Sequence, residues 1–191
     1  MSKAVHAFTV KLPHWAPHVT PVDLATATAE QLNAMKVTPS SKRVSEYVLT
    51  LAHDPESLAV RSPLFNAIMY GQDGLALAER ELGALGTSIV NRCVYCVAVH
   101  SARYIQLTKR AEVVDKIFSE ETEAQLDDYS QGIFDFAVAL AKTPAAATER
   151  HVHNLQDFGF DTLQMVDLVL AASIFSWANR LMHVLGEPIE Q

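Results

Sequence analysis

The sequence predicts an all-α fold, and three observations support this prediction. Apolar residues return at helical spacing through most of the chain, as in Val44, Tyr47, Val48 and Leu51, where the steps are three, one and three. No region shows the sustained alternation of apolar and polar residues that is typical of a half-buried strand. Hydrophobic residues make up 49% of the chain and charged residues 19%, which is enough apolar material for a substantial core.

The length of 191 residues fits one domain, or two small ones at most. Residues 1–22 are rich in Pro and His and show little periodicity, so we expect an extended arm that packs on the body or on a neighbouring subunit. A single helical domain is expected over residues 23–191. Its first predicted helix starts with a capping-box pattern, in which Thr28 is followed three residues later by Gln31, and it runs to about Lys36.

The later helices are predicted from the same apolar spacing and from their caps. Asp54 is a typical N-cap, and Pro55 fits the first turn of the helix that follows. Gly186, with Pro188 beyond it, is typical of the end of a final helix. The predicted ranges are 41–53, 55–70, 75–90, 93–107, 110–118, 121–142, 146–158 and 161–185.

Charge and hydropathy exclude several classes of partner. The formal net charge is -7 and the chain has no dense run of Lys or Arg, so we expect no nucleic acid partner. The first residues form no continuous apolar segment and do not resemble a signal peptide. The most apolar stretch, residues 165–186, is interrupted by Asp167 and Arg180, which favours a buried helix over a membrane span. We therefore expect a cytoplasmic protein, in which thiols stay reduced unless they cycle catalytically.

The stretch NRCVYCVAVH, residues 91–100, contains both cysteines of the chain. On a helix, Cys93, Cys96 and His100 would share one face, because they are separated by three and four residues. Cys93 would lie near the helix N-terminus, where the macrodipole and free N–H groups favour a thiolate. His100 would lie one turn from Cys96 and could exchange a proton with it. The spacing also allows an internal disulfide, so one sulfur can attack an oxidant and the other can close the bond.

Three other interpretations of the cysteines compete with a redox pair. Two buried core thiols are one of them, because free Cys is often buried. A structural zinc site would need a fourth ligand, and three ligands along one helix surround a tetrahedral metal poorly. Covalent haem requires a His directly after the second Cys, where Val97 stands, so haem attachment is rejected. We expect neither a metal nor another cofactor.

The segment RELGALGTSIVNRCVYCVAVH, residues 80–100, resembles the signature of the AhpD-like alkylhydroperoxidase family, part of the carboxymuconolactone decarboxylase superfamily. The family pattern is a Glu, eleven further residues and then C-x-x-C-x-x-x-H. Glu81, Cys93, Cys96 and His100 match all four positions of this pattern. The resemblance covers most of the chain, with a specific core of about twenty residues.

Two details refine the resemblance. The N-x-C-x-Y-C form, which contains Asn91 and Tyr95, is most similar to the subgroup called uncharacterised peroxidase-related enzymes, and SWANRL at 176–181 is similar to the last helix of that subgroup. The well-studied alkylhydroperoxidases have a second His where Tyr95 stands, and Tyr is a poor base near neutral pH, so the relay or the preferred substrate is expected to differ. Superfamily members that decarboxylate a lactone lack the C-x-x-C, which argues against that activity here.

The resemblance implies an AhpD-like helical domain that assembles into a homo-oligomer, a dimer, trimer or hexamer. It implies that Cys96 attacks a hydroperoxide, that Cys93 resolves the product as a disulfide, that His100 is the base and that Glu81 orients His100. The predicted function is a thiol-dependent peroxidase, an oxidoreductase with peroxide as acceptor. Its partners would be the hydroperoxide and an external dithiol protein that restores the thiols.

Two alternatives stay open. The same cysteine pair could serve a disulfide oxidoreductase or a thiol redox sensor, which would exchange electrons with a protein partner. The chain could also be a helical oligomer in which the cysteines have lost their function. Tyr95 and Asn91 could support the site or simply pack and cap, and His183 with Arg180 could form a structural pair or line the site.

Overall fold

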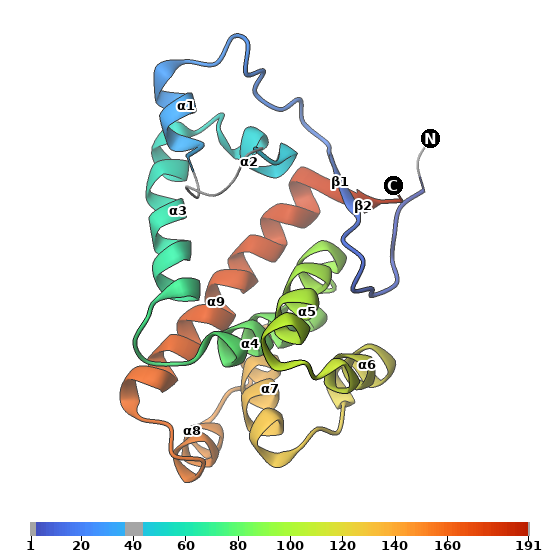
Figure 1. Cartoon of the computed structure of the whole chain (residues 1–191), viewed down its shortest axis with the longest axis vertical. Helices are drawn as coiled ribbons and strands as arrows, with labels where there is room; N and C mark the ends of the chain where they lie inside the picture. The colour runs from blue at the N-terminus through green and yellow to red at the C-terminus, as the bar shows by residue number, and fades with distance from the viewer. Residues whose placement is uncertain (1–2, 37–43, 191) are drawn as a thin grey trace.

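The computed structural model describes residues 3–36 and 44–190, and it confirms the all-α fold class. Figure 1 shows helices from end to end, with one small pair of strands where the two ends of the chain meet. The described elements are β1 (His14–Pro17), α1 (Ala29–Ala34), α2 (Glu46–Leu51), α3 (Pro55–Tyr70), α4 (Leu77–Val90), α5 (Val94–Thr108), α6 (Ala111–Glu120), η1 (Glu121–Glu123), α7 (Asp128–Ala141), α8 (Glu149–Asp157), α9 (Thr162–Leu185) and β2 (Gly186–Ile189).

The centre of the fold is α4, which packs against α5, α7 and α9 (Figure 1). Every residue of α4 from Arg80 to Ile89 is buried, including its polar ones. Leu82 and Leu85 join the largest apolar cluster, which also contains Phe134 of α7 and Leu168 of α9. Any functional group on this helix is therefore held in a rigid and dry environment.

Helix α9 is the long apolar helix at the C-terminal end. By length and composition alone it could cross a membrane. It packs, however, against α3, α4 and α7, and its Asp167 forms an ion pair with the buried Arg80 of α4, with Nη2 and Oδ2 2.9 Å apart. These contacts are those of a core helix, and the helix does not indicate a membrane protein.

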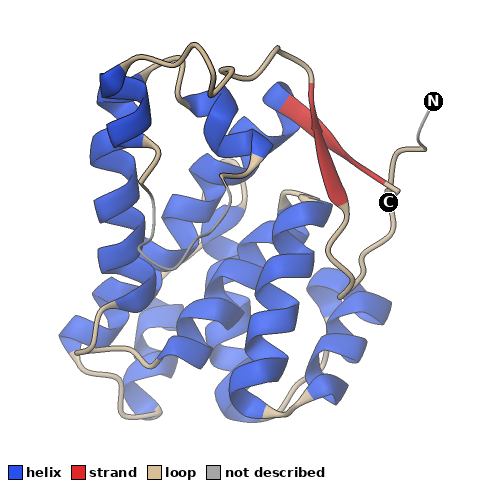
Figure 2. Ribbon diagram, turned by 45° about the horizontal axis from the view of Figure 1, so that its top comes forward, coloured by secondary structure: helices blue, strands red, loops and turns tan. Residues whose placement is uncertain are grey.

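The pair of strands was not expected from the sequence. β1 and β2 pair antiparallel, with Trp15 opposite Pro188 (Figure 2, red). Trp15 is buried, and its indole N–H donates to the carbonyl of Met182 at 3.2 Å. The N-terminal segment thus packs on the body of its own chain. Whether an arm and a domain divide at residue 23 stays a prediction.

The predicted end of the final helix is confirmed, and one other predicted helix is wrong. α9 ends at Leu185, and Gly186 has a fully extended backbone that starts β2. The helix predicted over 121–142 is split: Glu121 takes φ 52°, and α7 starts only after Asp127, whose carboxylate accepts the Ser130 N–H at 3.2 Å. The first part of the predicted helix 41–53 lies outside the described residues, and the observed helix starts after Ser45 as N-cap.

Replacing Gly186 by Ala is expected to destabilise the fold. A Cβ at this position would come within 2.3 Å of the Trp15 ring and 2.5 Å of the carbonyl oxygen of Ala16. Such overpacking costs about 1–3 kcal/mol of unfolding free energy, which urea denaturation would measure. Glu190→Ala, an exposed change in the same C-terminal segment, is the control and should have little effect. Equal stability of Gly186→Ala and the native protein would contradict the packing described.

Candidate active site

The cysteines lie at the junction between α4 and α5. Arg92 takes φ 54° and turns the chain, so that Cys93 becomes the N-cap residue of α5. The carbonyl of Cys93 accepts the Val97 N–H at 2.9 Å and begins the helix. This confirms that Cys93 stands at a helix N-terminus, where backbone N–H groups and the macrodipole favour negative charge.

The two thiols are adjacent. Cys93 and Cys96 lie 3.0 Å apart without a bond between them, and both are buried. A hydrogen bond from the Cys96 thiol lowers the pKa of Cys93, and the N–H groups of Cys96 and Tyr95 add to this effect. The same hydrogen bond, together with burial, raises the pKa of Cys96 well above its ordinary value. Of the two thiols, Cys93 is therefore the one that loses its proton more readily.

A buried amide that the sequence did not single out supports the cysteines. Asn179 of α9 is fully buried, and its Nδ2 donates to Ser88 Oγ at 3.3 Å. Its Oδ1 accepts from Asn91 Nδ2 at 3.1 Å, so the orientation of the amide is fixed. A hydrogen bond from this amide lowers the pKa of both Cys93 and Cys96. The sequence signal that could have identified Asn179 is an Asn within an otherwise apolar helix, because a buried amide needs hydrogen-bond partners.

His100 and Glu81 form a buried pair. The Nδ1 of His100 lies 2.5 Å from Oε2 of Glu81, and both side chains are almost inaccessible to solvent. A carboxylate only accepts hydrogen bonds, so the proton of the neutral ring lies on Nδ1 and Nε2 has a free lone pair. Among the described residues, Nε2 has no hydrogen-bond partner. The structure thus brings together Glu81 and His100 in the arrangement of a base and its orienting group.

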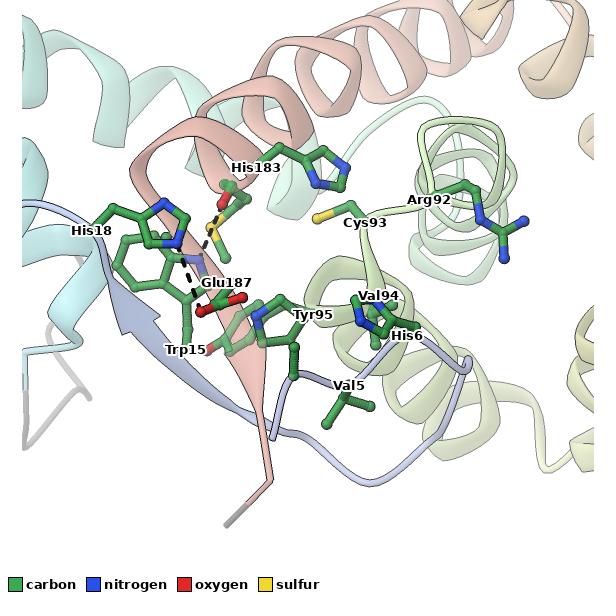
Figure 3. A pocket seen from close by; sticks show the side chains of 14 residues that line it. Val5, His6, Trp15, His18, Arg92, Cys93, Val94, Tyr95, His183 and Glu187 are labelled. Carbon is green, nitrogen blue, oxygen red and sulfur yellow. Dashed lines mark hydrogen bonds and ion pairs between the residues drawn. The ribbon is translucent and has the colours of Figure 1, made fainter. Parts of the chain in front are cut away.

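Each thiol opens onto its own cavity. Cys93 lines a cavity of about 430 Å³, and Figure 3 shows its sulfur pointing into this space beside His183. Cys96 and His100 line a second cavity of about 340 Å³. Tyr95 and Met182 line both cavities and form the wall between them. Tyr95 therefore contributes to the site as a wall, and burial raises the pKa of its hydroxyl.

His183 and Arg180 do not form a pair. His183 lines the Cys93 cavity, and its Nε2–H donates to the carbonyl of Asn91 at 2.7 Å. Arg180 donates to the carbonyl of Ser176 at 2.5 Å and to Thr143 Oγ1 at 3.3 Å, and it lines neither cysteine cavity. Within residues 3–36 and 44–190, no group of three or more His, Cys, Asp or Glu side chains is arranged to hold a metal.

Residues 55–128 match the Carboxymuconolactone decarboxylase family. The whole fold is similar to an alkylhydroperoxidase AhpD core, an uncharacterised peroxidase-related protein from Ralstonia eutropha JMP134: TM-score 0.78, 24% identity, 93% of this chain and 94% of that one. It is also similar to an uncharacterised peroxidase-related protein from Silicibacter sp. TM1040: TM-score 0.74, 23% identity, 91% and 93% of the two chains.

A third similar structure is that of a protein named as a debrominase. The debrominase Bmp8 matches with TM-score 0.73 and 18% identity, over 91% of this chain and 92% of that one. No curated protein matches the sequence. Since these solved structures share less than 25% identity with the chain, they show its fold and leave its reaction to be argued from the site.

The asymmetry of the two thiols gives a prediction about their titration. The Cys93 thiol should ionise below the ordinary cysteine pKa of about 8.5 and Cys96 well above it. Alkylation by iodoacetamide at a series of pH values, read at each site by mass spectrometry, measures both. Cys96→Ala removes the hydrogen-bond donor and should raise the pKa of Cys93. Two thiols that titrate together at the ordinary value would contradict this assignment.

Proposed function

We propose that this AhpD-like member of the carboxymuconolactone decarboxylase superfamily is a thiol-dependent peroxidase that reduces an organic hydroperoxide to an alcohol and water. The observation that supports it most directly is that Cys96 and His100 line the same cavity. There His100 is held by the buried Glu81 and has an unpartnered Nε2. A protonated thiol and a positioned base in one cavity are what nucleophilic attack on a peroxide requires.

In the first step, Cys96 gives its proton to Nε2 of His100 and its sulfur attacks one peroxide oxygen. The O–O bond breaks, and Cys96 becomes a sulfenic acid. The leaving alkoxide takes the proton back from Nε2 and departs as the alcohol. Glu81 stabilises the transient imidazolium through its hydrogen bond to Nδ1, which is 2.5 Å long.

In the second step, the Cys93 thiolate attacks the Cys96 sulfenic sulfur. A disulfide forms, and hydroxide leaves and is protonated to water. The separation of 3.0 Å and the lowered pKa of Cys93 both suit this resolving role. An external dithiol then reduces the disulfide and is itself oxidised. We propose the reducing cytoplasm as the location, since it supplies such dithiols.

A disulfide oxidoreductase or thiol sensor is the second candidate. The observation that favours it is that Cys93, whose pKa is lowered by its hydrogen bonds, lines a cavity of its own. A thiol that ionises readily can exchange with a partner disulfide that reaches this cavity, without any peroxide. The debrominase among the similar structures also shows that this fold supports other chemistry.

Stopped-flow oxidation of the reduced protein by cumene hydroperoxide separates the two candidates. A peroxidase loses both thiols for each peroxide consumed. His100→Ala should slow this loss by about 100- to 10,000-fold, the usual contribution of a general base. Glu81→Gln should slow it by a smaller factor, because His100 keeps a neutral hydrogen-bond partner.

His153→Ala removes an exposed histidine of α8 and is the matched control, with no change expected. Cys93→Ser should stall at the sulfenic acid, which dimedone traps, if the protein is a peroxidase. Slow thiol loss that does not depend on His100, with a mixed disulfide between Cys93 and a partner trapped in Cys96→Ser, would reject the peroxidase in favour of the exchange protein.

The expected homo-oligomer stays a prediction, and α9 suggests which face would form it. Leu163, Val166, Leu170 and Trp177 are exposed and follow one another at steps of three, four and seven residues. This is the heptad spacing of helices that pack on one another, so we expect a second copy of the chain to cover this face.

Sedimentation at micromolar concentration should show at least a dimer. Val166→Lys should shift it toward the monomer, because the charge would be buried in the interface. Val169→Lys, the neighbouring exposed apolar position off the heptad spacing, is the control and should leave assembly intact. A native protein that sediments only as a monomer would overturn the expectation.

A further inference from the structure

We propose that the Cys96 cavity takes a hydroperoxide that carries a carboxylate, and that Arg61 of α3 binds this carboxylate. The inference rests on the proposed peroxidase and names the substrate class of the same cavity. Its starting point is that Arg61, Cys96 and His100 line one space. Nothing in the thiol chemistry described above requires a cation at Arg61.

Arg61 is a partly buried cation without a counter-ion. Its guanidinium carbon lies 4.0 Å from the centre of the Phe65 ring and 5.5 Å from that of Tyr47. In the described part of the chain it forms no ion pair with a carboxylate, and its Nε is buried without a hydrogen-bond partner. The other arginine of the cavity, Arg103, differs because it pairs with Glu81.

Burial of a cation without a partner is costly, and aromatic rings offset only part of the cost. The described residues that line the cavity include neither Asp nor Glu. Tyr47 adds a second donor, because its buried hydroxyl has no acceptor among the described residues and interacts only with the Arg61 guanidinium beside it. Burial raises the pKa of Tyr47 to about 12, although the charge of Arg61 opposes this, so the hydroxyl stays protonated near neutral pH. An anionic group of the ligand would accept hydrogen bonds from both Arg61 and Tyr47.

The rest of the cavity lining is mostly apolar, so we expect the rest of the ligand to be apolar as well. The apolar side chains of the lining are Phe65, Met69, Val99, Phe175, Ala178 and Met182. A volume of about 340 Å³ is at the lower end for organic ligands, which suits a compact aromatic or short aliphatic acid better than a long acyl chain. The geometry points to a small acidic hydroperoxide, with its carboxylate on Arg61 and its peroxide at Cys96.

Another role for Arg61 would be to stabilise the Cys96 thiolate, because its positive charge lowers the pKa of Cys96 among other causes. The two roles make different predictions. Loss of thiolate stabilisation slows every hydroperoxide alike, whereas loss of a carboxylate anchor slows only the acid. A comparison of the rates with an acid and with its ester therefore distinguishes the two roles of Arg61.

The experiment compares para-carboxycumene hydroperoxide with its methyl ester on the native protein and on Arg61→Met. We expect the native protein to have a kcat/KM about 10- to 100-fold higher for the acid, as for a hydrogen bond to a charged group. Arg61→Met should remove this preference through a rise in KM for the acid, and Arg61→Lys should retain part of it. Arg150→Met, at an exposed arginine of α8, is the control and should keep the preference.

Equal rates of the native protein with acid and ester would overturn the proposal, and so would an equal slowing of both by Arg61→Met. If neither compound oxidises the dithiol of the native protein, the proposed peroxidase activity is wrong. A binding measurement then tests whether Arg61 binds a carboxylate. Calorimetric titration with para-isopropylbenzoate and its methyl ester should show binding of the acid alone, which Arg61→Met abolishes. Absence of acid binding to the native protein would reject the site.

Discussion

The hydrogen bond between Glu81 and His100 is the constraint on which the site depends. Glu81 lies on α4, where every neighbouring residue is buried, and an ionised carboxylate there would be very costly without partners. Its two oxygens meet His100 and Arg103, both on α5. The bond therefore fixes how α5 lies against α4. Because it occupies Nδ1, it also decides that Nε2 is the nitrogen of His100 available for proton transfer.

A second polar link holds the cysteines against α9. Asn179 connects Ser88 of α4 and Asn91 of the turn, so the backbone before Cys93 is tied to two helices. Near the other end of α9, Asp167 pairs with the buried Arg80 of α4. Polar side chains at both ends of an otherwise apolar interface fix the position of α9 along α4, which apolar packing alone would specify less strongly. A substitution of Asn179 would therefore also alter the positions of the two cysteines.

The sequence predicted the parts of the site that are local. Cys93, Cys96 and His100 lie within two helical turns, so their spacing alone placed them on one face, and the family resemblance added Glu81. Asn179 and Arg61 come from helices far away in the chain, and no local pattern shows what they contact. The same reason explains the missed strands, since β1 and β2 are about 170 residues apart and neither alternates clearly.

The position of the charge suggests why two thiols with different pKa values serve the proposed cycle. Cys96 lines the cavity proposed for the substrate and its pKa is raised, so in the proposed cycle it is a weak nucleophile until His100 accepts its proton. Cys93 has a lowered pKa and lies 3.0 Å away, so in the proposed cycle it attacks as soon as a sulfenic acid forms. A short-lived sulfenic acid has little time to meet a second peroxide, and oxidation to the irreversible sulfinic acid is thereby limited. In the proposed cycle, the hydrogen bond between the thiols thus sets the order of the two steps and limits overoxidation between them.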